Sequence, residues 1–511
     1  MWWLPLLFGA VLASLPVCEA SDEASVEHSR VFGNIHSYGY YFADILVGTP
    51  FQRQSVILDT GSAMTAFPCA SCESCGTVKL DPFFNSSMSS TFYWHGCGMQ
   101  TEEEETVDSS EWSCSCGQAD TTRVCTYGVS YVEGSSIAGK WFSDVAIVAS
   151  QPDGRQASRH SLGCHTRETN LFLTQKANGI MGVASPRASS RGQMEVPGVA
   201  TTLFDRSDED RDILSICLAE FGGSMSVGGF NASRHETDIS SGPGRNWTPL
   251  IHPRRYYVRS TGMKGPGGAD MGVPGVLLLD SGTTYSYLRR STYTRFRDLV
   301  NAHCESDSRC SARMIGGDLC YDLPSPDVVS EFPKVTLEFL GNVTVEWEPR
   351  SYLYRRGTRN VFCFGVANAG WGTAVLGQTF FVGRDVVFER FFSSGPLEAA
   401  EAVEPSWDAS GVPEGRWDRV AMPSADCPTV RLSDRPDLNE ERLSGENEAA
   451  MRQIGSLNLR GSSFALDGEG EVAFGEREKE NGGRRGDRAV RLKQMDVLQV
   501  VELEDDEGDW E

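Results

Sequence analysis

The sequence predicts a mostly-β protein made of two related lobes, and its strand pattern and an internal repeat are the observations behind this prediction. From Tyr38 to Arg390 the chain alternates short apolar segments with glycine-rich turns, and segments such as YYFADILVGTP and VTLEF have residue types typical of β-strands. Long amphipathic stretches are few, and the clearest helix candidate is TYTRFRDLVNAHC at residues 292–304. The chain of 511 residues is long enough for two or three domains.

The internal repeat relates two segments whose aspartates lie 221 residues apart. SVILDTGSAM at residues 55–64 is matched by VLLLDSGTTY at 276–285, and each copy is an apolar run that ends in Asp, followed by Thr or Ser and then Gly. A second matched pair follows downstream, NGIMG at 178–182 and AVLGQTF at 374–380. An isolated DTG is usually an Asx-turn at a strand end. Matched segments both before and after the two turns favour two lobes that each contribute one carboxylate.

The amino-terminus has the features of a secretory signal peptide. Residues 1–20, MWWLPLLFGAVLASLPVCEA, form an apolar run with the small residues Cys18 and Ala20 before a cleavage site. An uncleaved anchor is the alternative, but the short run with two prolines favours cleavage. Residues 21–36 then form a short N-terminal segment before a first strand that we expect at Tyr38. No other stretch reaches about 18 consecutive apolar residues, so we expect no membrane anchor after the signal peptide.

The charge balance is strongly acidic. The chain has 46 basic and 70 acidic residues, which gives a net charge of −24. No basic stripe is visible, and nucleic acid is therefore excluded as an expected partner. An acidic surface favours basic substrates through electrostatic steering, which salt weakens.

Cysteines and glycosylation sequons fit the secretory pathway. Removal of the signal peptide leaves 14 of the 15 cysteines, and this even number predicts seven disulfides in an oxidising compartment. Cys69, Cys72 and Cys75 could also be zinc ligands, but the secretory signal favours disulfides, so no metal site is expected. The candidate glycosylation sites are Asn85, Asn231, Asn246 and Asn342.

The two repeated aspartates, Asp59 and Asp280, predict a particular chemistry if the lobes bring them into contact. Two adjacent carboxyl groups cannot both ionise easily, so the pair shares one proton and titrates as a unit. The ionised member can take a proton from water, and the protonated member can polarise a carbonyl group. The expected reaction is peptide hydrolysis without a metal, a cofactor or a covalent intermediate.

Small and hydroxyl residues follow both aspartates in matching order. The glycines let backbone amides approach the carboxylates closely. The hydroxyl residue next to each aspartate can hydrogen-bond across the axis that relates the lobes, and the hydroxyl residue three positions after each aspartate can hold its outer oxygen. The supporting residues are Thr60, Gly61 and Ser62 in the first motif and Ser281, Gly282 and Thr283 in the second.

These motifs resemble those of the pepsin-type aspartic proteases. DTGS and DSGT at this spacing are specific for that family, and the resemblance covers roughly Tyr38–Cys427. It implies a bilobal fold with the active-site cleft between two pseudo-twofold-related lobes. TYGVSYVEGSSIAG at 126–139 matches the family's flap, so the resemblance implies that Tyr131 closes over substrate and that Gly134 lets the hairpin bend.

The resemblance narrows to plasmepsin V and related apicomplexan-type export proteases, carried by SVILDTGSAMTAFPCASCESCG and SYVEGSSIAGKWFSDV. The cysteine-rich insertion at 69–125 is similar to that branch and to nepenthesin-like plant enzymes. Ala66 stands where pepsin-like enzymes usually have a tryptophan, so the flap tyrosine is expected to lose its indole partner. Glu133 matches a flap glutamate that helps bind a substrate arginine three residues before the cut; the alternative is a solvated hairpin residue. Val132 replaces the branch's unpaired flap cysteine, and the resemblance implies no inhibitory prosegment.

The leading functional hypothesis is an aspartic endopeptidase of the secretory pathway, in the ER or Golgi lumen, in an endomembrane vesicle or secreted. Its partners would be polypeptide substrates, cut at an Arg-x-Leu-like motif, and the protein is expected to be a monomer. One alternative is a secreted nepenthesin-type protease of broad specificity. Another is a catalytically silent homologue that acts as a binding protein.

The expected organisation follows from these assignments. The N-terminal lobe contains the cysteine-rich insertion and the flap, the C-terminal lobe is interrupted by an insertion, and an acidic, disordered tail follows. In chain order the segments are 1–20, 21–36, 37–240 (with 69–125 and 126–139 inside it), 241–428 (with 391–418 inside it) and 429–511.

Overall fold

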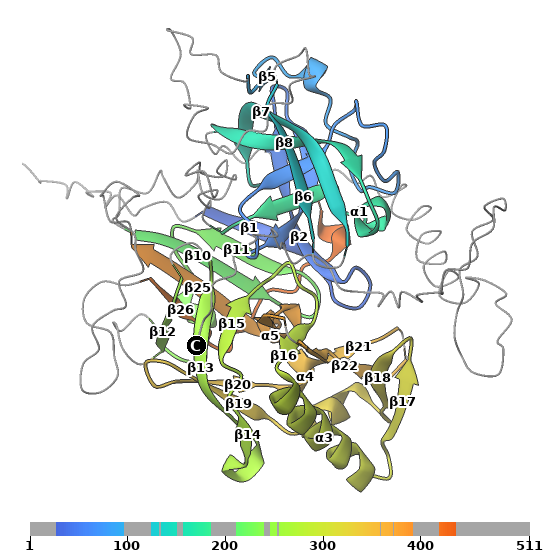
Figure 1. The fold of residues 1–511 in the computed structure, drawn as a ribbon, viewed down its shortest axis with the longest axis vertical. Coiled ribbons are helices and arrows are strands. Elements are labelled where there is room, and N and C mark those ends of the chain that lie inside the picture. The colour runs from blue at the N-terminus through green and yellow to red at the C-terminus, as the bar shows by residue number, and fades with distance from the viewer. Residues whose placement is uncertain are drawn as a thin grey trace, which may run out of the picture.

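The computed structural model describes most of the chain between residues 27 and 435. The described ranges are 27–96, 124–131, 134–150, 157–184, 211–239, 246–252, 255–357, 359–370, 372–391 and 418–435. Strands dominate these ranges, so the mostly-β prediction is confirmed. Figure 1 shows two lobes, one above the other, joined by a sheet in the middle of the molecule.

The upper lobe and the middle of the molecule share one 14-stranded sheet. The upper strands are β1 (Glu27–Asn34), β2 (Tyr40–Val47), β3 (Gln52–Asp59), β4 (Thr65–Pro68), β5 (Tyr93–Trp94), β6 (Thr126–Ser130), β7 (Ser136–Ile147), β8 (Ser158–Glu168) and β9 (Gly179–Gly182), with the short helix α1 (Leu171–Thr174). The middle strands are β10 (Arg211–Leu218), β11 (Gly223–Val227), β12 (Trp247–Pro249), β25 (Arg384–Phe391) and β26 (Arg419–Ala421).

The lower lobe has an eight-stranded and a four-stranded sheet. The first contains β13 (Tyr257–Lys264), β14 (Asp270–Gly272), β15 (Val276–Leu279), β16 (Ser286–Leu288), β19 (Val335–Phe339), β20 (Val343–Trp347), β23 (Val366–Asn368) and β24 (Ala374–Leu376). The second contains β17 (Ser311–Ile315), β18 (Asp318–Asp322), β21 (Leu353–Arg355) and β22 (Val361–Phe364).

The predicted helix lies within α3 (Arg290–Ser306). Phe296, Val300 and Cys304 are buried at intervals of four residues, which places one face of the helix against the core. The other helices of the described residues are short: α4 (Pro349–Tyr352), α5 (Gln378–Phe381) and the 3-10 helices Ser86–Met88, Ala232–Arg234, Pro266–Gly268, Pro326–Glu331 and Leu432–Asp434.

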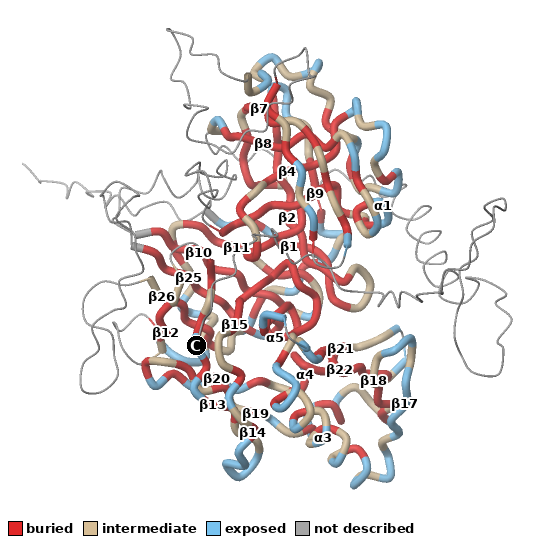
Figure 2. The backbone as a smooth tube through the Cα atoms, viewed as in Figure 1, coloured by how far each residue is buried: buried red, intermediate tan, exposed pale blue. Residues whose placement is uncertain are grey.

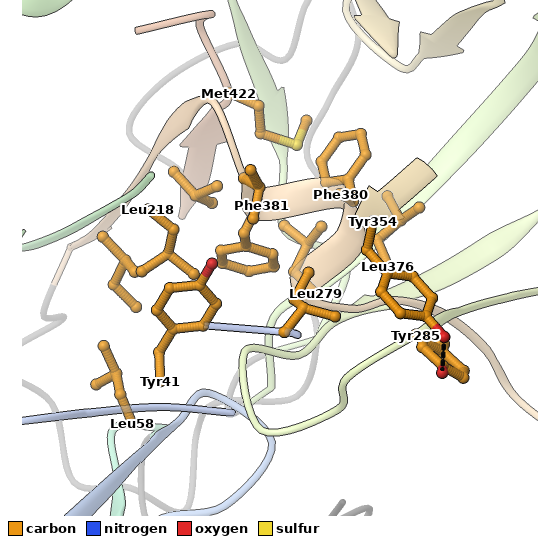
Figure 3. Packing of buried hydrophobic residues seen from close by; sticks show 14 of the residues in the cluster. Tyr41, Leu58, Leu218, Leu279, Tyr285, Tyr354, Leu376, Phe380, Phe381 and Met422 are labelled. Atoms are coloured by element: carbon orange, nitrogen blue, oxygen red, sulfur yellow. Dashed lines mark hydrogen bonds between the residues drawn. The ribbon is translucent and has the colours of Figure 1, made fainter. Parts of the chain in front are cut away.

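The core continues from one lobe into the other. Figure 2 shows buried backbone through both lobes and the middle sheet. Leu58 and Leu279, the residues that precede the two aspartates, belong to the same buried cluster as Tyr41 and Phe381, and Figure 3 shows this packing. The strands that end at Asp59 and Asp280 therefore rest on one continuous hydrophobic core.

The first strand begins earlier than predicted. The expected start at Tyr38 is wrong, because β1 already pairs with β2 and β11 in antiparallel fashion. The segment alternates, with His28 and Arg30 exposed and Ser29 and Val31 buried. The polar side chains of one face hid this strand pattern, since successive side chains of a strand point to opposite faces and only the buried face needs to be apolar.

The last described residues, 429–435, also differ from the prediction. The predicted disordered tail, 429–511, begins too early, because residues 429–435 pack against the upper lobe. Val430 N donates to Phe221 O at 2.9 Å, and Arg435 is buried. Upstream, β25 pairs with β26 across a segment that the structure does not describe, so the insertion at 391–418 stays a prediction.

Every cysteine in the described residues is in a disulfide. Cys69–Cys164 and Cys72–Cys75 account for the three cysteines of the alternative zinc site, so disulfides replace that hypothesis. The other described pairs are Cys217–Cys427, Cys304–Cys310 and Cys320–Cys363, and Cys125 is also bonded. The total of seven stays a prediction. Across the described ranges, no helix is long and apolar enough to span a membrane.

Candidate active site

Two matching strand pairs place the two aspartates. β3 ends at Asp59 and runs parallel to β9, with Asp59 opposite Gly182. β15 ends one residue before Asp280 and runs parallel to β24. Parallel strands buried on both faces favour continuous apolar runs, which explains SVIL and VLLL. Each carboxyl group therefore stands where an apolar strand ends and a turn begins.

The turns of the two lobes are hydrogen-bonded to each other. Thr60 N donates to Ser281 Oγ at 3.1 Å, and Ser281 N donates to Thr60 Oγ1 at 2.9 Å. The two hydroxyl groups donate to the main chain of the opposite lobe, Thr60 to Leu279 O at 2.9 Å and Ser281 to Leu58 O at 2.7 Å. This reciprocal arrangement fixes the separation of the two turns.

The Asp59 carboxylate is oriented by its own turn. Gly61 N donates to Asp59 Oδ1 at 2.7 Å, and Ser62 Oγ donates to Asp59 Oδ2. Both oxygens are therefore held by donors two and three residues further along the chain. The side chain of Asp59 is fully buried.

Asp280 has the same pair of donors. Gly282 N donates to Asp280 Oδ1 at 2.8 Å, and Thr283 Oγ1 donates to Asp280 Oδ2 at 2.6 Å. The sequence-based prediction that hydroxyl and glycine residues surround both carboxylates thus matches the geometry of the two turns.

The two glycines bring the aspartates together. A Cβ atom on Gly61 would lie 2.9 Å from Asp280 Oδ1, and one on Gly282 would lie 2.4 Å from Asp59 Oδ1. Each glycine therefore faces the carboxyl group of the other lobe, and any side chain at either position would collide with it.

The electrostatics of the pair support proton sharing. Burial, and then the charge of Asp59, raise the pKa of Asp280 well above its usual value. A hydrogen bond between the two carboxyl groups adds to this increase, while donors from Thr283 and Gly282 oppose it. The pair therefore retains a proton at a pH where isolated carboxyl groups are ionised.

The predicted flap is a hairpin of β6 and β7, and Tyr131 lies at its turn. Tyr131 N donates to Ser135 O, and Gly134, with φ of 94°, closes the turn by donating to Tyr131 O. A positive φ of this size favours glycine. Val132 and Glu133 lie outside the described residues.

A different aromatic residue backs Tyr131 in place of the missing tryptophan. The rings of Tyr131 and Phe172 lie 5.2 Å apart. Ala66 and Tyr127 both lie against Gly163, because a Cβ on Gly163 would lie 2.7 Å from Ala66 Cβ and 2.8 Å from the Tyr127 hydroxyl group. Phe172 and Tyr127 were not singled out from the sequence, because nothing local indicates which aromatic residues meet beneath the hairpin.

Comparison with known proteins shows which family the chain belongs to. A family model described as "Asp: Eukaryotic aspartyl protease" matches residues 40–393. The chain belongs to the eukaryotic aspartyl protease family. The aspartyl protease fold and the family resemblance predicted from the sequence are thus confirmed.

Several relatives of this aspartyl protease cover most of its chain. Aspartic protease 5 of Toxoplasma gondii is 33% identical over 420 residues, which are 80% of this chain and 39% of the relative. Plasmepsin V of Plasmodium falciparum is 24% identical over 514 residues, which cover 84% of this chain and 77% of the relative. ASPARTIC PROTEASE IN GUARD CELL 2 of Arabidopsis thaliana is 26% identical over 72% of this chain and 74% of the relative. The aligned part thus spans well under half the length of the Toxoplasma protein.

Two residues near the aspartyl protease dyad were missed by the sequence analysis. Arg255 Nη1 donates to Gly61 O, and Tyr256 Oη donates to Val183 O at 2.9 Å. Both side chains come from the segment before β13 and contact the turn or the strand end beside Asp59. RRYYV is a plain strand-like pattern, so no local signal distinguishes these residues.

The sequons occupy different settings. Asn342 is exposed in the turn between β19 and β20, with φ of 56°. Asn85 and Asn231 each cap a short 3-10 helix and accept a hydrogen bond from the serine of their own sequon. Asn246 Nδ2 donates to Asp238 O at 2.8 Å. Glycosylation of these sites stays a prediction.

Proposed function

We propose that this chain is an aspartic endopeptidase in which Asp59 and Asp280 jointly activate a water molecule. The observation that carries this proposal is the pair of buried carboxyl groups, held by matched donors and facing each other across two glycines. The ionised carboxyl group takes a proton from water while the water oxygen attacks the peptide carbonyl carbon. The protonated carboxyl group donates to the carbonyl oxygen, and a proton then passes to the leaving amine as the carbon–nitrogen bond breaks.

The supporting residues have distinct roles in this proposal. Ser62 and Thr283 hold the outer oxygens, so each carboxyl group keeps its orientation as the proton moves. Thr60 and Ser281 keep the two loops at a constant separation. Tyr131 would cover bound substrate and exclude water, and Gly134 would let the hairpin move.

The test is digestion of a peptide library by the purified chain and by Asp59→Asn and Asp280→Asn. Asparagine keeps the size of the side chain but cannot exchange a proton, so each variant should lose activity by at least about 100-fold. Denaturation curves that match the unaltered protein would show that both variants fold. Undiminished digestion by either variant would refute the catalytic assignment. An inactive unaltered chain would favour the binding homologue.

We further propose that substrates carry arginine three residues before the cut, with Glu133 as its partner and a hydrophobic residue such as leucine nearer the cut. This rests on the match of SYVEGSS to the plasmepsin V flap, since Glu133 lies outside the described residues. A guanidinium–carboxylate pair would discriminate against lysine through its two-pronged geometry. The acidic net charge of −24 also favours basic substrates.

Matched peptides can test this specificity. Glu133→Gln should reduce kcat/KM for arginine peptides by about 10-fold or more and leave the corresponding norleucine peptides unchanged. An equal decline for both peptide sets would contradict the role of Glu133. Efficient cleavage of many denatured proteins without an arginine preference would instead favour the nepenthesin-type alternative.

We also propose that the protein works in the secretory pathway as a monomer. The signal peptide, the sequons and the disulfide bonding of all described cysteines support this compartment. An endoglycosidase should lower the apparent mass of protein from eukaryotic cells, and light scattering should give the mass of one chain. No mass change, together with a cytosolic location, would contradict the compartment.

A further inference from the structure

Arg255 connects the lower lobe to the loop that carries Asp59. Its side chain is buried, and Nη1 donates to Gly61 O. Gly61 in turn donates through its amide to Asp59 Oδ1 at 2.7 Å and faces Asp280 through its Cα atom. The Arg255 guanidinium is therefore connected to both carboxyl groups of the dyad through a single residue, Gly61.

In the part of the chain that the structure describes, no acidic side chain pairs with the guanidinium of Arg255. Within the described ranges its hydrogen bond goes to a main-chain carbonyl, and it forms no ion pair. Removing a cation from water costs several kcal/mol unless nearby negative charge compensates it. Through Gly61, Arg255 is linked by hydrogen bonds to the Asp59 carboxylate, which accepts from the Gly61 amide.

The segment around Arg255 is fixed at two further points. Arg255 N donates to His252 Nδ1 at 3.0 Å, which holds the start of the segment. Tyr256 Oη donates to Val183 O, and Val183 N donates to Asp59 O at 2.8 Å. The Arg255 guanidinium and the Tyr256 phenol thus both hydrogen-bond the main chain beside Asp59.

Other charged groups lie near Tyr256. Arg390 is 4.7 Å from the centre of its ring, and Asp212 and Asp418 act on it electrostatically. The side-chain donors to the two carboxyl groups, Ser62 and Thr283, are uncharged hydroxyl groups. His252, whose Nδ1 accepts from Arg255 N, is a titratable side chain beside Arg255. Of the described charged side chains, Arg255 is the one that hydrogen-bonds a catalytic loop.

We propose that Arg255 is a positioning residue that anchors the Asp59 loop from the opposite lobe and supplies the positive charge that sets where on the pH scale the dyad is active. The inference rests on the proposed function of Asp59 and Asp280. A nearby cation favours the ionised form of a carboxyl group and lowers the pKa of both ionisation steps of the pair. Removal of the charge should therefore move both limbs of a bell-shaped pH profile to higher pH.

The pH profile should be displaced by about 0.5–1 pH unit. This is the effect expected of one charge that is partly screened and is separated from the dyad by Gly61. Arg255→Met removes the charge and keeps an apolar stem. Arg255→Lys keeps the charge and loses the planar fork, so its profile should stay in place even if kcat falls. Arg259→Met is the matched control, because Arg259 is exposed on β13, four residues away.

The experiment measures kcat/KM against pH with an uncharged peptide substrate. The proposal predicts a displaced profile for Arg255→Met and unmoved profiles for Arg255→Lys and Arg259→Met. An unmoved profile for Arg255→Met, or equal displacement for Arg255→Lys, would overturn it. A rise in KM confined to acidic peptides, with the profile in place, would also overturn it in favour of substrate recognition.

A second measurement serves if Arg255→Met is inactive. Binding of a transition-state analogue with a hydroxyl group in place of the scissile carbonyl depends on dyad protonation and needs no turnover. Its pH dependence should move upward by the same amount in folded Arg255→Met, and an unmoved curve would refute the proposal. Failure of the proposed function is recognised separately, by full activity of Asp59→Asn or Asp280→Asn.

Discussion

Replacement of Arg435 by methionine should destabilise the upper lobe by about 3–5 kcal/mol, the usual cost of stranding a buried charge. The Arg435 side chain is fully buried against the upper lobe. Its Nε and Nη2 donate to Asp44 at distances from 2.6 to 3.0 Å, and Nη2 also donates to Asp81 at 2.7 Å. Burial opposes the charge of Arg435, but the two carboxylates more than reverse this effect and raise its pKa.

The two carboxylates should respond differently. Asp81 also pairs with Arg53 at 3.1 Å, whereas Arg435 is the cation that pairs with Asp44 in the described structure. The substitution therefore leaves Asp44 as a buried charge without a counter-ion, while Asp81 keeps a partner. Most of the lost free energy of unfolding should come from Asp44.

Chemical denaturation followed by circular dichroism measures this loss. Arg431→Met is the control, because Arg431 is exposed in the same segment and should change stability by less than about 0.5 kcal/mol. Adding Asp44→Asn to Arg435→Met should restore part of the stability, since it removes the stranded charge. Equal stability of the Arg435→Met and Arg431→Met proteins would refute the reasoning.

Truncation of the chain tests the same segment. A chain ending at residue 436 should keep its stability, and one ending at 428 should lose it.

Two more predictions concern titratable groups of the upper lobe. Lys79 Nζ lies 3.2 Å from Glu168 Oε2 with both side chains buried, and Glu168 also contacts His165 at 3.0 Å. Lys79→Met should therefore cost about 1.5–3 kcal/mol, the range for a hydrogen bond to a charged group, and Lys264→Met, at an exposed pair, should cost under about 1 kcal/mol. Equal losses in denaturation curves would contradict this. Burial lowers the pKa of His95 to about 4, against 6.5 for the ordinary side chain. The unfolded chain therefore binds a proton that the folded chain rejects, so stability should fall as pH drops from about 6.5 to 4. His95→Gln should flatten this part of the pH–stability curve, and an unchanged slope would count against the assignment.

The chemistry of the two turns could be predicted because it is local. The donors to Asp59 come from Gly61 and Ser62, two and three residues further on, and the second turn repeats this spacing. A tripeptide with an apolar strand before it thus specifies both the turn and the orientation of the carboxyl group. The repeat of this pattern then indicated two lobes and one shared site.

The strand β1 and the aromatic residue behind Tyr131 could not be predicted, because the residues involved meet their partners only in the folded chain. The strand β1 was missed because His28 and Arg30 gave it a polar outer face. The ring that backs Tyr131, that of Phe172, comes from a helix beyond β8, and the local pattern around Tyr131 does not indicate this contact.

By itself, the sequence determined the mostly-β class, the two-lobed repeat and the family, and it indicated Asp59 and Asp280 as the dyad that we propose. The tertiary structure decided which distant residues complete these features. Arg255 meets Gly61 across 194 residues, and Arg435 meets Asp44 across 391. The physical reason is that a buried cation is specified by the fold around it, and its short flanking sequence, RRYYV or LSDRP, carries no signal of where its counter-charge will lie.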